Sequence, residues 1–214
     1  MIRSTYRDAR RRRSGRAGER GQGLVEFAMV VVVMLLLLLG MLEFGFVFDQ
    51  TLTLSYGTRE GARTGAAFAN GNSSTLICTT SADIDKFVVA AVQRVLEAPG
   101  SRVTIGNVSE VRIYNSNAAG VQIGSSFNRW TPGVGPTVDG VPLKFNQTTN
   151  NWNACTRDND WTGSNPPDSL GVSVSYSYTY VTPLAAILTF FGPGGPATLP
   201  ITDRTVMALN PTND

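Results

Sequence analysis

The chain has 214 residues, of which 42% are apolar and only 16% are charged, whereas about a quarter of the residues of a soluble globular domain carry a charge. Histidine is absent and there are only two cysteines, which excludes histidine-based catalysis, histidine metal sites and four-cysteine zinc or iron–sulfur motifs. Residues 1–20 contain eight arginines against Asp8 and Glu19, a net charge of +6, so the rest of the chain is mildly acidic at −4.

The longest apolar segment, residues 24–48, predicts a transmembrane helix. Its 25 residues would extend about 37 Å as a helix, against a hydrocarbon core of about 30 Å. Seventeen of them are Leu, Val or Phe, and their summed transfer energy exceeds the cost of the two carboxylates in the segment. Insertion is therefore favourable, with Glu26 and Glu43 near opposite rims of the hydrocarbon.

The arginine-rich tail directly precedes this segment. The positive-inside rule therefore keeps residues 1–21 in the cytoplasm and places the chain after about residue 50 outside. A cleaved secretory signal is the alternative, but it requires an apolar region of about 7 to 15 residues followed by a small-residue cleavage site, whereas Glu43 and bulky apolar residues follow here. Topology also explains the arginines more simply than nucleic-acid binding does, so no nucleic-acid partner is expected.

Helical character is expected to continue beyond the membrane, because no proline occurs before Pro99 and the first loop-forming cluster is at 70–74. Residues 22–69 are therefore predicted to form one transmembrane and extended helix.

Three glycines, Gly57, Gly61 and Gly65, recur every four residues in this helix. They form a stripe without side-chain bulk, where another backbone can approach closely. The alternative is that the glycines mark a fraying helix end. Regular spacing favours packing.

Residues 70–214 predict an extracytoplasmic α+β head. Apolar positions spaced by three and four residues indicate a second helix from Ser81 to about Pro99. Alternating patterns predict an antiparallel sheet of 3–4 strands. The strand signals are at 103–105, 111–113, 171–180 and 205–209.

Residues 115–169 are rich in Asn, Gly, Ser and Pro and are interpreted as a loop-rich insertion. Trp130, Trp152 and Trp161 are scattered through it. They would either stack against a sugar-like ligand or pin the loop onto the sheet, and packing is the more common role of aromatic side chains.

Cys78 and Cys155 both follow the membrane segment, in a compartment where disulfides persist. A bond between them is predicted, and two free buried thiols are the alternative.

No phosphate-binding loop, nucleophile elbow or C-x-x-C motif occurs. Asp158, Asp160 and Asp168 lack the spacing of a calcium loop. The chain is therefore expected not to be an enzyme, with no catalytic, cofactor-binding or metal-ligating residue and no small-molecule substrate. A membrane-bound hydrolase using Asp158 and Asp160 is an alternative without supporting partner residues.

The segment RGQGLVEFAMVVVVMLLLLLGMLEFGFVFDQ at 20–50, followed by REGAR at 59–63, resembles the TadE-like family of the tight-adherence, or Flp, pilus system. SLGVSVSYSYTYVTPLAAIL at 169–188 and TDRTVMALNP at 202–211 are similar to the same family. The resemblance implies a type IV pilin-like protein of the bacterial inner membrane, with a single N-terminal helix and an α+β head. It would act as a minor pilin or pseudopilin, in the membrane or in the surface pilus, with other pilin-like and Tad platform proteins as partners.

The resemblance also implies that a prepilin peptidase cuts between Gly21 and Gln22, which makes residues 1–21 a leader and leaves Glu26 five residues into the mature chain. Gly23 offers a competing cleavage site, and Phe27 stands where the major pilins of this system have tyrosine.

In this interpretation Glu26 sets the register between helices and Glu43 adds a second polar contact. The stripe of Gly57, Gly61 and Gly65 permits close packing with other pilin-like helices. A surface adhesin or carbohydrate-binding protein that uses residues 115–169, with the helix as a tether, is the alternative function.

Overall fold

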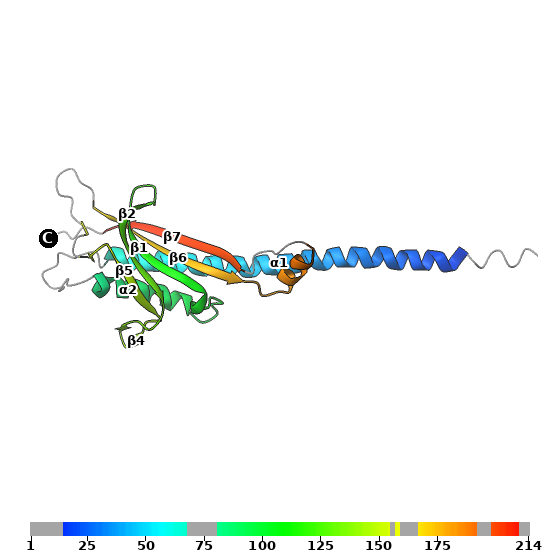
Figure 1. Cartoon of the computed structure of the whole chain (residues 1–214), viewed down its shortest axis with the longest axis horizontal. Coiled ribbons are helices and arrows are strands. Elements are labelled where there is room, and N and C mark those ends of the chain that lie inside the picture. Colours follow the sequence, from blue (N-terminus) through cyan, green and yellow to red (C-terminus); the bar gives the residue numbers. More distant parts are fainter. Residues whose placement is uncertain (1–14, 68–80, 155–156, 159–166, 192–197, 210–214) are drawn as a thin grey trace, which may run out of the picture.

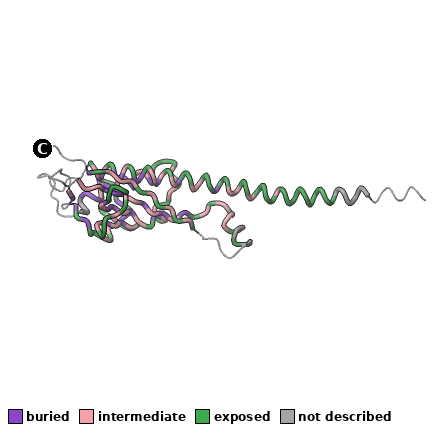
Figure 2. Tube along the Cα trace, turned by 90° about the horizontal axis from the view of Figure 1, so that it is seen from above, coloured by how far each residue is buried: buried purple, intermediate pink, exposed green. Residues whose placement is uncertain are grey.

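A computed structural model describes residues 15–67, 81–154, 157–158, 167–191 and 198–209. These residues form a head at one end of a long helix (Figures 1 and 2). The helices are α1 (Gly15–Ala67), α2 (Ser81–Leu96), the 3-10 helix η1 (Ile105–Asn107) and α3 (Leu184–Phe191). The strands are β1 (Val108–Ser116), β2 (Gln122–Pro132), β3 (Thr137–Val138), β4 (Val141–Pro142), β5 (Phe145–Asn150), β6 (Ser169–Thr179) and β7 (Thr198–Ala208).

Helix α1 is continuous over 53 residues, which corresponds to about 80 Å. Its C-terminal half lies along the head and its N-terminal half projects away from it (Figure 1). The absence of proline allows this length, as the sequence predicts. The predicted α+β class with a long N-terminal helix and a second helix is confirmed.

The sheet of the head is antiparallel, with the strand order β5-β2-β1-β6-β7, and β3 and β4 form a separate hairpin. Helices α1 and α2 pack together on one face of it, where α1 contacts β6 and β7. Strand β6 alternates as the sequence predicts: Val172 and Val174 are buried, and Ser173 and Ser175 are half-buried.

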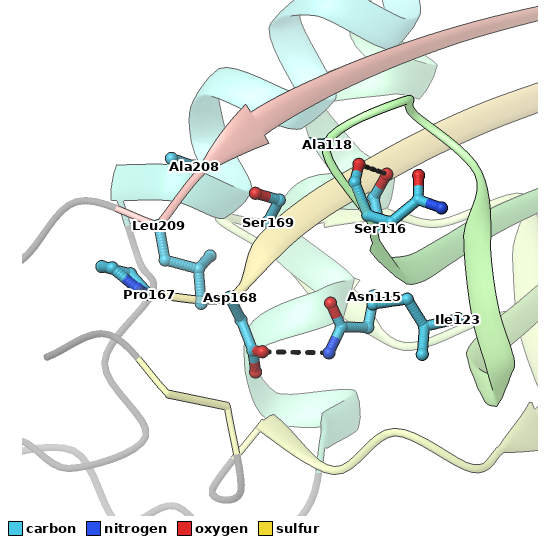
Figure 3. Close-up of a pocket in the computed structure, with 10 residues that line it drawn as sticks. Asn115, Ser116, Ala118, Ile123, Pro167, Asp168, Ser169, Ala208 and Leu209 are labelled. Carbon is cyan, nitrogen blue, oxygen red and sulfur yellow. Dashed lines mark hydrogen bonds between the residues drawn. The ribbon is translucent and has the colours of Figure 1, made fainter. Parts of the chain in front are cut away.

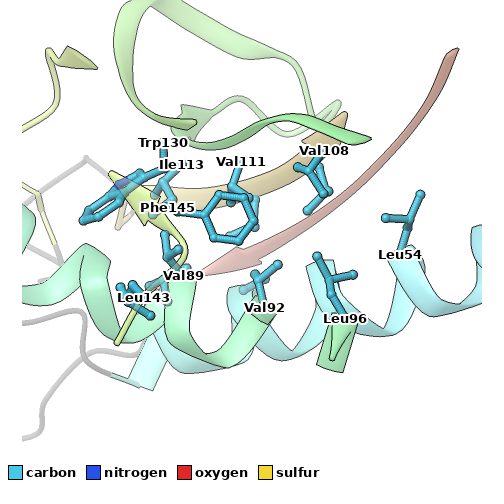
Figure 4. Close-up of a cluster of buried hydrophobic side chains, with 14 of the residues drawn as sticks. Leu54, Val89, Val92, Leu96, Val108, Val111, Ile113, Trp130, Leu143 and Phe145 are labelled. Atoms are coloured by element: carbon cyan, nitrogen blue, oxygen red, sulfur yellow. The ribbon is translucent and has the colours of Figure 1, made fainter. Parts of the chain in front are cut away.

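The core lies between the two helices and the sheet (Figure 4). It is apolar on both sides, so burial of this surface supplies the main stabilisation of the head. Its largest fully buried side chains include Trp130, Tyr178, Phe145, Leu54, Leu96, Ile113 and Leu170.

Two expectations about strands are wrong. The sheet has five strands rather than 3–4, because residues 115–169 contain β2 to β5 instead of a loop-rich insertion. Strand β2 pairs with β1, with Val111 opposite Trp130. Its Gln, Ser and Asn residues hide the alternating pattern, and pairing with β1 and β5 supplies the order that local propensity does not. Residues 103–105 form no strand, and Ile105 begins η1.

The glycine stripe is covered inside the head. Gly57, Gly61 and Gly65 are all buried, and the first two lie against Val92 while the last lies against Leu170. The close packing expected from their spacing is therefore present, but α2 and β6 of the same chain provide it. This corrects the expectation that the stripe contacts other pilin-like helices.

We predict that Gly61→Ala destabilises the head while Gly57→Ala does not. A Cβ at Gly61 would lie 2.6 Å from Val92 Cγ2 and 3.3 Å from Val172 Cγ1, whereas at Gly57 the nearest atom is Leu96 Cδ2 at 3.4 Å. Overpacking costs about 1 to 3 kcal/mol, and alanine gains about 1 kcal/mol of helix propensity at either position. Urea unfolding of the full chain in detergent should give a lower midpoint for Gly61→Ala. Equal midpoints would contradict the close contact.

Candidate functional site

The projecting half of α1 exposes an apolar surface. None of residues 21–42 is buried, and the most apolar window of the candidate membrane span, Gly21–Ala67, is 0% buried. Large side chains such as Leu24, Phe27 and Met41 are 70%, 66% and 77% exposed. A core helix of a soluble protein would be covered, so this surface requires lipid or other helices around it.

Glu26 lies on this exposed surface. Its Oε1 accepts a hydrogen bond from Gln22 Nε2 at 3.0 Å, one helical turn away. Gly21 and Gln22 are inside the helix, because α1 begins at Gly15. The described part of the chain thus places Glu26 where a partner helix could reach it.

Glu43 has a different environment, since it is only 3% exposed. Its Oε1 accepts hydrogen bonds from the Tyr178 hydroxyl and, at 3.0 Å, from Val181 N. Its Oε2 accepts from the Thr182 hydroxyl and, at 2.9 Å, from Thr182 N. Four donors surround one carboxylate, which satisfies a group that would otherwise be costly to bury.

This geometry corrects the expectation that Glu43 contacts other subunits. The carboxylate joins α1 to the segment between β6 and α3 of its own chain. Burial, and then the hydrogen bond to Glu43, raise the pKa of the Tyr178 hydroxyl, so Tyr178 remains a proton donor at physiological pH. Tyr178 and Thr182 were not predicted as partners of Glu43, because the alternation of β6 indicates which residues face inward but not what they contact.

A second buried ionic contact lies in the head. Arg157 Nη2 is 2.8 Å from Asp85 Oδ1, and both side chains are almost fully buried. Asn128 Nδ2 donates to Asp85 Oδ2 at 2.6 Å. Burial raises the pKa of the Asp85 carboxyl, and the Arg157 guanidinium opposes that rise. The ion pair joins Asp85 of α2 to Arg157, which lies near the end of the 115–169 region predicted as an insertion.

The two described tryptophans of the 115–169 region, Trp130 and Trp152, are packed inside the head. Trp130 is 1% exposed and Trp152 is 5% exposed, and the Arg157 guanidinium lies over the Trp152 ring at 4.2 Å. Neither ring is available to stack on a ligand. Trp161 lies outside the described residues.

A pocket of about 470 Å³ opens beside the start of β6 (Figure 3). In it Asp168 Oδ1 accepts a hydrogen bond from Asn115 Nδ2 at 3.0 Å, and Asp168 Oδ2 accepts from Asp158 N at 3.0 Å. These bonds give Asp168 a structural role. The described residues contain no group of three or more His, Cys, Asp or Glu side chains able to hold a metal ion. Asp160, Cys78 and Cys155 lie outside the described residues, so the predicted disulfide stays a prediction.

The segment that resembles a known family includes the exposed half of α1 and most of the half that lies along the head. Residues 21–63 match the TadE-like protein family. The match confirms the resemblance over about a fifth of the chain and connects the chain with tight-adherence pilus systems as a membrane-associated component. No curated protein and no solved structure matches the chain significantly.

We predict that Glu43→Gln loosens the junction between the TadE-like helix and the head. An amide retains one acceptor oxygen. Its NH₂ group would face N–H and O–H groups that now donate to the other carboxylate oxygen, and it cannot accept their hydrogen bonds. Leaving buried donors unpaired costs about 1 to 3 kcal/mol. Urea unfolding of the full chain in detergent should show this loss. Glu26→Gln is the matched control, since it changes one exposed hydrogen bond and should leave the urea midpoint unchanged. Equal shifts of the midpoint in the two variants would contradict the role of Glu43.

Proposed function

We propose that the chain is a minor pilin-like or pseudopilin-like subunit of a tight-adherence pilus system, and that it acts in assembly without catalysis. Helix α1 would pack against the helices of other pilin-like subunits, with Tad platform proteins as further partners. The supporting observation is that residues 21–42 leave the head with no buried position, within the segment that matches the TadE-like family.

We further propose a single-pass topology in the bacterial inner membrane, with the arginine-rich N-terminus in the cytoplasm and the head outside. The asymmetry of charge supports this orientation. The structure adds an argument against a cleaved secretory signal. A cut just after the apolar run would remove Glu43, which accepts hydrogen bonds from Tyr178, Val181 and Thr182 of the head.

Glu26 is proposed to set the register between packed helices. A carboxylate in lipid is costly unless it is paired, and in this single chain it has the Gln22 side chain as its described hydrogen-bond partner. If a prepilin peptidase cuts after Gly21, Gln22 gains a free amine one turn from Glu26. That amine, on the same or a neighbouring subunit, would neutralise the carboxylate when helices bundle.

Glu26→Ala is expected to leave membrane insertion intact but to reduce the number of pili. Removing the carboxylate lowers the cost of insertion while it deletes the proposed register contact. Electron microscopy of cells that carry the variant as their only copy, with membrane fractionation, measures both effects. Asp49→Ala is the control, because Asp49 lies on the same helix and is exposed. Normal piliation with Glu26→Ala would contradict the register role.

Cleavage at Gly21 is tested separately. The N-terminal residue of chain extracted from membranes should be Gln22, with the intact mass reduced by residues 1–21. Because α1 is helical across this bond, the peptidase would have to open one turn of it. A persistent Met1 terminus would reject processing, and a Leu24 terminus would show that Gly23 is the site used.

A further inference from the structure

Helix α3 is apolar in sequence, and none of its described side chains is buried. Its sequence is LAAILTFF, and no charged residue occurs between Asp168 and Asp203. Among its described side chains, Ala186 and Thr189 are exposed and the others are half-buried. Eight residues are too few to cross a bilayer, which takes about 20. A partly exposed helix of this composition favours another apolar environment.

The position of α3 is set by the Glu43 junction. Thr182, whose N–H and hydroxyl donate to Glu43, also accepts a hydrogen bond from Leu184 N at 3.3 Å through its Oγ1. The first turn of α3 is thereby joined to α1 at the level of Glu43, and α3 packs against α1. Both views show α3 on the side of the head from which the exposed half of α1 leaves (Figures 1 and 2).

This level corresponds to the edge of the membrane. The exposed apolar surface of α1 continues past Glu43, with Phe44 and Phe48 at 70% and 55% exposure. The segment 24–48 is longer than the hydrocarbon core by about 7 Å, so a centred helix leaves about 3.5 Å, less than one turn, in the interfacial layer at each end. Arg102 lies there too, with its guanidinium 4.8 Å from the Phe46 ring, and cations and aromatic rings favour this depth.

We propose that α3 inserts into the extracytoplasmic interface of the bilayer that α1 crosses, so that the head has a second contact with lipid. Lipid is favoured over a second protein chain because α3 lies at the same level as exposed apolar side chains of α1, and because α3 has no charged or amide side chain that would mark a specific protein contact. The two anchors would fix the tilt and rotation of the head relative to the membrane. The inference needs α1 to span the bilayer but does not depend on pilus assembly.

Tryptophan quenching by brominated lipids tests this contact. The full chain with Ala186→Trp is reconstituted in phosphatidylcholine vesicles that carry bromine at different depths of the acyl chain. Ala186 is exposed, so the larger ring fits. The fluorescence of the native chain is subtracted to give the emission of the added tryptophan. We expect bromine near the carbonyl end of the acyl chain to quench this emission strongly, and bromine near the methyl end to quench it less.

Val134→Trp is the matched control, since Val134 is 95% exposed and lies between β2 and β3. Its added emission should not respond to bromine. Equal emission of Ala186→Trp in brominated and plain vesicles would overturn the proposal. Quenching that disappears as the ratio of protein to lipid rises would also overturn it, in favour of coverage of α3 by a second copy. Because these vesicles contain no other pilus component, either result leaves the Glu26 experiment independent.

Discussion

The structure depends on one constraint: α1 is a single rigid helix whose two halves face different surroundings. Its C-terminal half is packed by α2, β6 and β7, and residues 21–42 of its N-terminal half are largely apolar and have no buried position. A continuous helix satisfies its own backbone hydrogen bonds except in its terminal turns, so the same element can enter lipid and also form part of a protein core. Any force on the membrane half is therefore transmitted directly to the head.

Glu43 marks the boundary between these halves. A carboxylate at this point is costly in hydrocarbon and costly in a core unless it is hydrogen-bonded. The segment after β6 supplies the four donors, and the same segment leads into α3. The two carboxylates of the apolar segment therefore have different surroundings: Glu43 joins α1 to the segment after β6, whereas Glu26 is exposed and accepts a hydrogen bond from Gln22.

Sequence patterns predicted the elements whose periodicity is local and strong. The apolar run of α1, the spacing of Val88, Val92 and Leu96 in α2, and the alternation of β6 all reappear in the structure. Strands β2 and β5 were missed because Gly, Ser, Asn and Gln interrupt their alternation, and their order comes from pairing with distant neighbours. The glycine stripe was correctly assigned to packing, but spacing cannot say whose side chains fill it.

The sequence by itself determined the apolar segment, its charged flank and its similarity to the TadE-like family, because length, composition and charge order are properties of consecutive residues. Only the tertiary structure decided which carboxylate is buried and which surface remains open. Glu43 and Tyr178 are 135 residues apart in the chain, and their contact exists only because β6 runs alongside α1. No local pattern contains that information.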